Sequence, residues 1–200
     1  MARVVVGLVA WLLAAGAPAQ EAAGPVTAEF RVFAGTEEIT ATTRLRIMPT
    51  GTRERSSTLD EGKPLVASVT PGIYDVQALR LRPEGIVAIR WAERLVLMHY
   101  PDEGGRHLEV INFQPGYGAL QVRAASGSMG AYELTVFSAG DRTAPAGEPI
   151  DGDDYRLFVL KAGRYDIRVR QAGAPKGAPD SQWLRDIEVP AHRTRLKVIA

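Results

Sequence analysis

The chain has 200 residues, contains no cysteine, and carries 24 lysines and arginines against 23 aspartates and glutamates. A chain without cysteine has no disulfides, no thiolate nucleophile and no cysteine-linked lipid anchor, so its stability must come from packed cores alone. Because both signs of charge are mixed along every segment, we expect no nucleic-acid partner and no polybasic membrane-binding face.

The first 20 residues, MARVVVGLVAWLLAAGAPAQ, predict a signal peptide. One positive charge, Arg3, precedes an apolar run from Val4 to Ala15, and small residues follow at Ala17 and Ala19. That run is too short to cross roughly 30 Å of hydrocarbon, and no later stretch is long and apolar enough to do so. We expect a signal peptide at 1–19, export to the periplasm or the extracellular medium, and a mature chain that is not an integral membrane protein.

The sequence after the signal peptide predicts a set of strands that occurs twice. The segments between the strands are predicted loops, and they are rich in glycine and proline, of which the chain has 20 and 13. The phrase VTPGIYDVQ at 69–77 returns as LKAGRYDIR at 160–168, and further segments recur in the same order. Segment 85–100 also fits a helix, but its counterpart 183–190 alternates like a strand, so we expect a strand. The other recurring pairs are 29–34 and 119–124, 44–51 and 133–140, 64–69 and 155–160, 91–97 and 183–189, and 106–112 and 194–200.

This repetition predicts the duplication of a module of about ninety residues. We expect an all-β fold with two tandem antiparallel β-sandwich domains after the signal peptide, the first at 24–114 and the second at 118–200. Segments 50–63, 138–154 and 171–182 are expected to be loops. The hinge at 112–118 is short, so we expect the two modules to contact each other.

The repeated phrase itself predicts a turn followed by a half-buried strand. Gly72, after a proline, and Gly163 occupy the position that needs a positive φ in a type II turn. In the strand that follows, Tyr74 and Val76 fall on one face and Asp75 falls on the other. This period-two alternation indicates that the tyrosine face is buried and the opposite face is wet.

A turn with Gly-x-Tyr-Asp-Val, followed by a strand that carries a tryptophan, resembles the penultimate-strand entry of immunoglobulin-like and fibronectin type III sandwiches. It is also similar to carboxypeptidase-regulatory-like, or prealbumin-like, modules of bacterial exported proteins. The resemblance implies an immunoglobulin-like or prealbumin-like sandwich whose tyrosine hydroxyl bonds to nearby backbone. It implies binding and spacing roles rather than catalysis, and it transfers no site residues to this chain. The metal-binding signature of von Willebrand A-type domains, which such modules accompany, does not occur here.

The search for catalytic and metal-binding motifs gives weak candidates only. Ser128 in ASGSMGA lacks the spacing of a nucleophile elbow, which favours a glycine-rich turn. The segment QPGYGALQ lacks the third glycine of a dinucleotide fingerprint. The segment 151–155, DGDDY, lacks the ligand alternation and closing glutamate of a calcium loop. A second set of potential metal ligands lies on an expected hairpin turn: His99, Asp102, Glu103, His107 and Glu109. Zinc would accept such ligands, although histidines on a solvated turn are the commoner case. We therefore expect no catalytic residue, no cofactor and no metal.

The aromatic residues decide between two kinds of function. Four recur in register in both modules and are expected to form the cores, because a duplicated core is commoner than a duplicated ligand site: Tyr74, Trp91, Tyr165 and Trp183. Three others lie in or beside loops and are candidates for contact with a partner: Tyr100, Tyr117 and Tyr155. The alternative is that the recurring aromatics form a carbohydrate-binding platform.

The sequence thus predicts a noncatalytic interaction or scaffold protein of the bacterial cell envelope whose partner is another envelope or surface protein. A glycan-binding, lectin-like module pair that recognises polysaccharide is the alternative. An enzyme with an unrecognised site is the third hypothesis.

Overall fold

The computed structural model describes residues 24–52, 55–99, 106–126, 128–174 and 182–199. The predicted signal peptide at 1–19 lies outside these residues. The described chain is all-β, as predicted, and its only helices are two short 3₁₀ turns, η1 (Thr40–Thr42) and η3 (Met129–Ala131). None of the described helices is long and apolar enough to cross a membrane.

The strands of the described residues form four sheets of four strands each. Sheet A contains β1 (Val26–Ala34), β2 (Glu37–Glu38), β5 (Val66–Val69) and β8 (Arg106–Asn112). Sheet B has the order β4 (Ser57–Leu59), β3 (Thr43–Pro49), β6 (Gly72–Arg82), β7 (Gly85–Leu97). Sheet C has the order β12 (Ile150–Asp151), β13 (Tyr155–Lys161), β9 (Tyr117–Ala124), β16 (Thr194–Ile199). Sheet D has the order β11 (Pro145–Gly147), β10 (Tyr132–Ser138), β14 (Gly163–Gln171), β15 (Gln182–Val189).

The two halves of the chain share their main strand pairings, although the short β2 pairs with β1 whereas the short β12 pairs with β13. In the N-terminal half β1 pairs with β5 antiparallel and with β8 parallel, and in the C-terminal half β9 pairs in the same way with β13 and β16. Strands β4-β3-β6-β7 of sheet B correspond in order to β11-β10-β14-β15 of sheet D. The predicted recurring segments all contain strands, and segment 85–97 is strand β7 rather than a helix. The short strands β4, β11 and β12 lie in segments that were expected to be loops.

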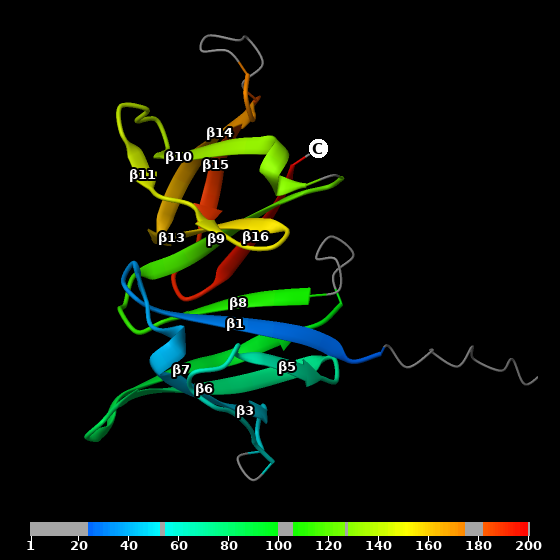
Figure 1. Cartoon of the computed structure of the whole chain (residues 1–200), viewed down its shortest axis with the longest axis vertical. Coiled ribbons are helices and arrows are strands. Elements are labelled where there is room, and N and C mark those ends of the chain that lie inside the picture. Colours follow the sequence, from blue (N-terminus) through cyan, green and yellow to red (C-terminus); the bar gives the residue numbers. More distant parts are fainter. Residues whose placement is uncertain (1–23, 53–54, 100–105, 127, 175–181, 200) are drawn as a thin grey trace, which may run out of the picture.

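The sheets stack in the order B, A, C, D along the long axis (Figure 1). One apolar cluster, which includes Phe30 and Val76, fills the space between sheets A and B, and a second, which includes Phe158 and Ile167, lies between sheets C and D. A third cluster joins sheets A and C through residues such as Phe33 and Leu157. Both halves therefore contact each other through a packed core, as the short hinge predicted.

Sheets A and C are covered on both faces, so their central strands have no exposed face. Every residue from His107 to Asn112 and from Gly118 to Arg123 is buried. The turn before β16 and the start of that strand also reach the other half: Arg90 Nη2 lies 2.9 Å from His192 Nδ1, and the backbone N–H of Val110 donates to Thr194 Oγ1 at 2.9 Å. These contacts place β7 and β8 beside the β15–β16 turn.

The tyrosine of the repeated phrase bonds to nearby backbone, as the resemblance to immunoglobulin-like sandwiches implied. The hydroxyls of Tyr74 and Tyr165 donate to the carbonyl oxygens of Thr70 and Lys161, both at 2.6 Å. Both rings are also part of the apolar clusters, with 9% and 7% of their surface exposed, so the predicted core role of the two tyrosines is confirmed.

The predicted positive φ of Gly72 and Gly163 is wrong, because neither is among the glycines with positive φ. Each is the first residue of its strand and pairs in register with the neighbouring strand. A Cβ at Gly72 or Gly163 would lie 3.4 or 3.6 Å from the ring of the tyrosine two residues later, which is ordinary contact. The phrase therefore begins a strand directly and contains no type II turn.

The aspartate of the phrase holds a β-bulge in the adjacent strand. Arg94 and Asp186 have φ of 55° and 59°, and their backbone N–H groups donate to Asp75 Oδ1 at 2.9 Å and to Asp166 Oδ1 at 3.0 Å. The register shifts at both places, where two residues on β7 or β15 oppose one aspartate. A carboxylate that accepts this N–H stabilises a conformation that residues other than glycine seldom adopt.

These bulges explain why the predicted core role of Trp91 and Trp183 is wrong. Trp91 would share a face with the buried Leu95 in a regular strand, but the intervening bulge reverses the alternation. Trp91 is therefore in register with Gln77, and Trp183 with Arg168, on the outer faces of sheets B and D. Both tryptophans are half-buried rather than core residues.

Candidate functional site

The described residues among the catalytic and metal-binding candidates of the sequence form hydrogen bonds or close polar contacts with other parts of the protein. Ser128 Oγ accepts a hydrogen bond from the backbone N–H of Gly130 at 3.2 Å and so caps η3. His107 Nε2 lies 3.0 Å from Glu109 Oε1 and both side chains are buried, whereas His99 Nε2 lies 2.7 Å from the carbonyl oxygen of Gly24. Asp102 and Glu103, like Tyr100, lie outside the described residues. Within the described ranges no three histidine or carboxylate side chains are grouped as a metal site would need.

The segment 151–155 lies at the junction of the two halves. Its three carboxylates form ion pairs with arginines: Asp151 with Arg156 at 3.0 Å, Asp153 with Arg106 at 3.6 Å, and Asp154 with Arg123 at 3.2 Å. A polar hollow of about 220 Å³ lies here, lined by residues of both halves. Because its charges are paired with one another, the hollow is best described as part of the contact between the halves.

The two described loop tyrosines also belong to this contact. Tyr155 Oη donates to Glu29 Oε1 at 3.1 Å, and burial together with the Glu29 carboxylate raises the pKa of Tyr155. Tyr117 packs against the apolar cluster between sheets A and C. Neither side chain presents the free aromatic surface that was expected of a partner-binding residue.

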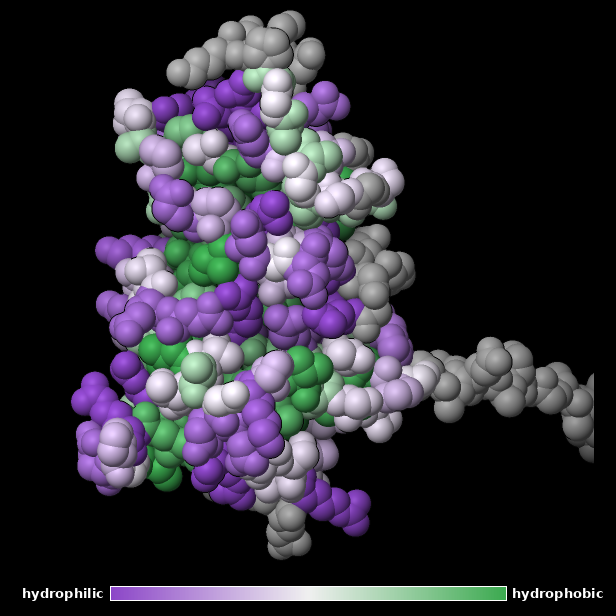
Figure 2. Space-filling view, viewed as in Figure 1, coloured by the Kyte–Doolittle hydropathy of each residue, from purple (hydrophilic) through white to green (hydrophobic). Residues whose placement is uncertain are grey.

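An apolar patch lies on the β6–β7 hairpin, which projects from the side of the stack (Figure 1). We use the name hairpin patch for Ile86, Val87 and Ile89, whose side chains are 56%, 44% and 55% exposed. Ile89 is in register with Leu79 of β6. The remaining exposed large apolar residues of the described chain lie nearby in sequence: Val66, Ile73, Val96 and Met98. Hydrophobic surface is visible beside the lower sheets in Figure 2.

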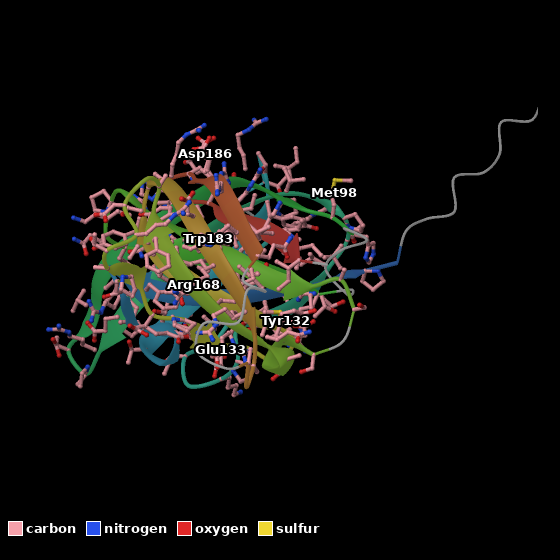
Figure 3. The ribbon with its side chains drawn as sticks, turned by 90° about the horizontal axis from the view of Figure 1, so that it is seen from above. Met98, Tyr132, Glu133, Arg168, Trp183 and Asp186 are labelled. Carbon is pink, nitrogen blue, oxygen red and sulfur yellow. The ribbon has the colours of Figure 1, made fainter. Side chains whose placement is uncertain are left out.

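The outer face of sheet D, at the other end of the stack, combines aromatic rings with arginines (Figure 3). The guanidinium of Arg142 lies 4.1 Å from the centroid of the Trp183 ring, which is 5.7 Å from the Phe137 ring at an interplanar angle of 42°. Arg168 lies over Phe137 at 5.5 Å, and its Nη2 donates to Thr135 Oγ1 at 3.3 Å. We call these five residues the sheet D platform.

Two charges of this face differ in their pairing. Arg142 is 3.5 Å from Asp166, whose pKa is lowered by the backbone N–H of Asp186 and further by Arg142 itself. Arg168 forms no ion pair with any described residue, and its buried Nε–H has no acceptor among them. Of these two arginines, Arg142 therefore pairs with the bulge aspartate, whereas Arg168 has no carboxylate partner among the described residues.

No protein-family model and no curated protein matches the chain. Among solved structures it is similar to the Bacillus anthracis TIE protein, with 11% identity and a TM-score of 0.28, over 88% of this chain and 34% of that one. The chain therefore spans about a third of that protein. It is also similar to a candidate adhesin from Bacteroides ovatus (11% identity, TM-score 0.30, 82% and 83% covered) and to a candidate cell adhesion protein from Bacteroides fragilis (9%, 0.27, 87% and 92%). At such TM-scores these likenesses carry no weight for fold or function.

Proposed function

We propose that this protein is an exported, noncatalytic interaction protein of the bacterial cell envelope that binds a protein partner through the hairpin patch. In this proposal it consists of two copies of one immunoglobulin-like or prealbumin-like sandwich module, 24–114 and 118–200, after a signal peptide at 1–19. The matching strand connections of the two halves support the duplication.

The distribution of exposed apolar side chains carries the proposal. All the exposed large apolar residues of the described chain belong to the N-terminal half, between Val66 and Met98. The C-terminal half has the same scaffold without such residues, so the scaffold does not require them. A contiguous exposed apolar patch is unfavourable in water, and in soluble proteins it commonly marks an interaction site. Ile86, Val87 and Ile89 are exposed apolar side chains close together in sequence on a projecting hairpin.

The positions of the tryptophans favour protein binding over a lectin-like module pair. Trp91 lies on the outer face of sheet B and Trp183 on that of sheet D, with sheets A and C between them. A polysaccharide-binding row would need its aromatic rings side by side on one surface. The two modules therefore cannot combine these tryptophans into one platform.

Site-specific crosslinking tests the proposal. A photo-crosslinking residue placed at Ile89 should give one discrete adduct with an envelope protein, whereas the same group at the exposed Glu188 of sheet D should not. With the purified partner, the double substitution Ile86→Ser and Ile89→Ser should weaken binding at least about tenfold, since buried anchors dominate interfaces. Equal adducts at both positions, or adducts only with a second copy of this chain, would contradict the proposal.

A further inference from the structure

We propose that the hairpin patch is one end of a longer apolar strip on the outer face of sheet B, and that the partner covers this strip with an acidic protein segment that carries apolar side chains. The inference rests on the proposed function, because it names the chemistry of the partner that the hairpin patch binds. The register of β6 against β7 and the balance of charge on sheet B carry it.

The strand register places exposed apolar side chains of both strands on one face. In β6 the side chains of Tyr74, Val76 and Ala78 belong to the apolar cluster between sheets A and B, so the odd-numbered residues of that strand lie on the outer face. Residues that oppose each other in an antiparallel pair share a face, so their partners in β7 lie there too. Three apolar pairs occupy the outer face in this way: Ile73 with Val96, Leu79 with Ile89, and Leu81 with Ile86.

Two bulges in β7 keep these side chains on the same face. Ile86 and Ile89 are three residues apart, and Ile89 and Val96 are seven apart, so a regular strand would place each pair on opposite faces. A register shift beside Val87 corrects the first interval, and the bulge that Asp75 holds corrects the second. The strip therefore continues from the hairpin patch along β6 and β7 to Val96.

The strip is open to solvent at both ends. Ile73 and Val96 are 43% and 41% exposed at one end, and Ile86 and Ile89 are 56% and 55% exposed at the other. Leu79 is buried, yet it belongs to none of the three apolar clusters between the sheets. Sheet D has no exposed large apolar side chain among its described residues, so the shared scaffold does not require this strip.

The charge of sheet B is unbalanced as well. Its strands contain only two carboxylates, Asp75 and Glu93, whereas the described strands of sheet D contain four arginines and four carboxylates. A balanced set is therefore compatible with the same strand order. The strands of sheet B contain six arginines: Arg44, Arg46, Arg80, Arg82, Arg90 and Arg94.

Loop carboxylates compensate two of these six charges. Asp60 and Glu61 lie 3.3 and 3.0 Å from Arg44, and Glu84 lies 4.0 Å from Arg82. Asp75 is already engaged by the bulge and by the hydroxyl of Thr50 at 3.1 Å. The other four arginines form no ion pair with any described residue: Arg46, Arg80, Arg90 and Arg94.

Two of the uncompensated arginines flank the strip. Arg46 is exposed on β3 and opposes Gln77, which lies on the outer face of β6. Arg94 is exposed on β7, between Ile89 and Val96. A segment that covers the strip therefore meets guanidinium groups at its sides, and these groups bind carboxylates through two parallel hydrogen bonds.

These features select an acidic partner with apolar anchors. A second copy of sheet B would supply the apolar side chains, but it would also bring like-charged arginines together, which opposes association. A segment with both leucine-like and acidic side chains covers the strip and neutralises its flanks. From Ile86 to Val96 the strip spans roughly 30 Å, at about 3.3 Å per residue, which an extended segment of about ten residues would match.

Peptide probes test the proposal on the full chain. A dye-labelled peptide of about ten residues that alternates leucine with glutamate should bind at least about tenfold more tightly, by fluorescence anisotropy, than two others of equal length. One of these alternates leucine with lysine, and the other alternates serine with glutamate. The double variant Ile73→Ser and Val96→Ser lies outside the hairpin patch and should weaken binding of the leucine–glutamate peptide at least about fivefold.

A second pair of variants tests the flanking charges. Arg46→Gln combined with Arg94→Gln should weaken binding of the leucine–glutamate peptide at least about fivefold and reduce its dependence on salt. Arg168→Gln combined with Arg185→Gln removes the same two charges from sheet D, is the matched control, and should bind as the wild type does. Thermal melts establish that each variant is folded during the titration.

Each alternative outcome assigns the surface differently. Equal binding of the leucine–lysine peptide would overturn the acidic partner, and equal binding of the serine–glutamate peptide, or no binding of the leucine–glutamate peptide at about 1 mM, would overturn the apolar strip. Unchanged binding by Ile73→Ser and Val96→Ser would confine the site to the hairpin patch. Binding only to phosphatidylglycerol vesicles would assign the strip to a lipid surface and overturn the protein segment. A discrete adduct from Ile89 with an envelope protein would still support the proposed function after the first three outcomes, so the two proposals fail separately.

Discussion

Replacement of Gly118 by alanine tests how strand β9 is fixed against the turn before β16. A Cβ built at Gly118 lies 2.1 Å from the carbonyl oxygen of Pro190 and 3.1 Å from Val189 Cγ1. Ordinary contact would need more than 3 Å, so the two backbone segments must separate by roughly 1 Å. That movement strains two hydrogen bonds, from Ala119 N–H to Arg193 O at 3.0 Å and from His192 N–H to Tyr117 O at 2.8 Å.

The expected destabilisation follows from these contacts. Overpacking costs about 1 to 3 kcal/mol, and two weakened backbone hydrogen bonds add about 1 kcal/mol each. We expect Gly118→Ala to lower the free energy of unfolding by about 3 to 5 kcal/mol and the Tm by roughly 10 °C. Urea and thermal unfolding of the full chain measure both quantities.

Gly163→Ala is the matched control. The Cβ at Gly163 would lie 3.6 Å from the Tyr165 ring and φ there is not positive. We therefore expect a change within about 0.5 kcal/mol, in contrast to what a type II turn would have required. If Gly118→Ala proved as mild as Gly163→Ala, the reasoning about the packing of β9 against Pro190 would be refuted.

Three further predictions concern the C-terminal half. Tyr165→Phe removes the hydrogen bond to Lys161 O and should destabilise by about 1 kcal/mol in urea unfolding; an unchanged midpoint would show that this hydrogen bond does not stabilise the fold. The backbone N–H of Asp186 lowers the pKa of Asp166 in the folded chain. The ionised carboxylate of Asp166 therefore stabilises the folded chain at pH values above its unfolded pKa near 3.8, and this contribution is lost as the pH falls through the lower pKa of the folded chain. Asp166→Asn should flatten the dependence of Tm on pH between about 2 and 6, and a curve parallel to wild type would refute this. Trp183→Ala should cost about 1 to 2 kcal/mol, because the ring is half-buried; a loss of 4 kcal/mol or more would restore a core role.

The repeated phrase shows how far the sequence predicts this fold. Period-two alternation correctly placed Tyr74 and Val76 in one core and their counterparts in the other, because regular strands expose alternate faces. The same rule failed for the tryptophans, since a bulge that one aspartate holds reverses the alternation beyond it. A bulge leaves no signature in the apolar pattern, so the pattern alone places Trp91 on the same face as Leu95.

The hairpin patch was harder to predict. The apolar run around Ile86 and Ile89 has the composition of a buried strand, and only the structure shows that these side chains are exposed on a projecting hairpin.

The affinity of the hairpin patch for its partner tests the central claim most directly. The partner identified by crosslinking at Ile89 is purified and titrated with the wild-type chain, with the Ile86→Ser and Ile89→Ser double variant, and with Arg168→Gln. We predict that the serine variant binds at least about tenfold more weakly while Arg168→Gln binds as the wild type does. Equal affinities of the wild type and a folded serine variant would contradict the proposal that this hairpin is the protein-binding surface.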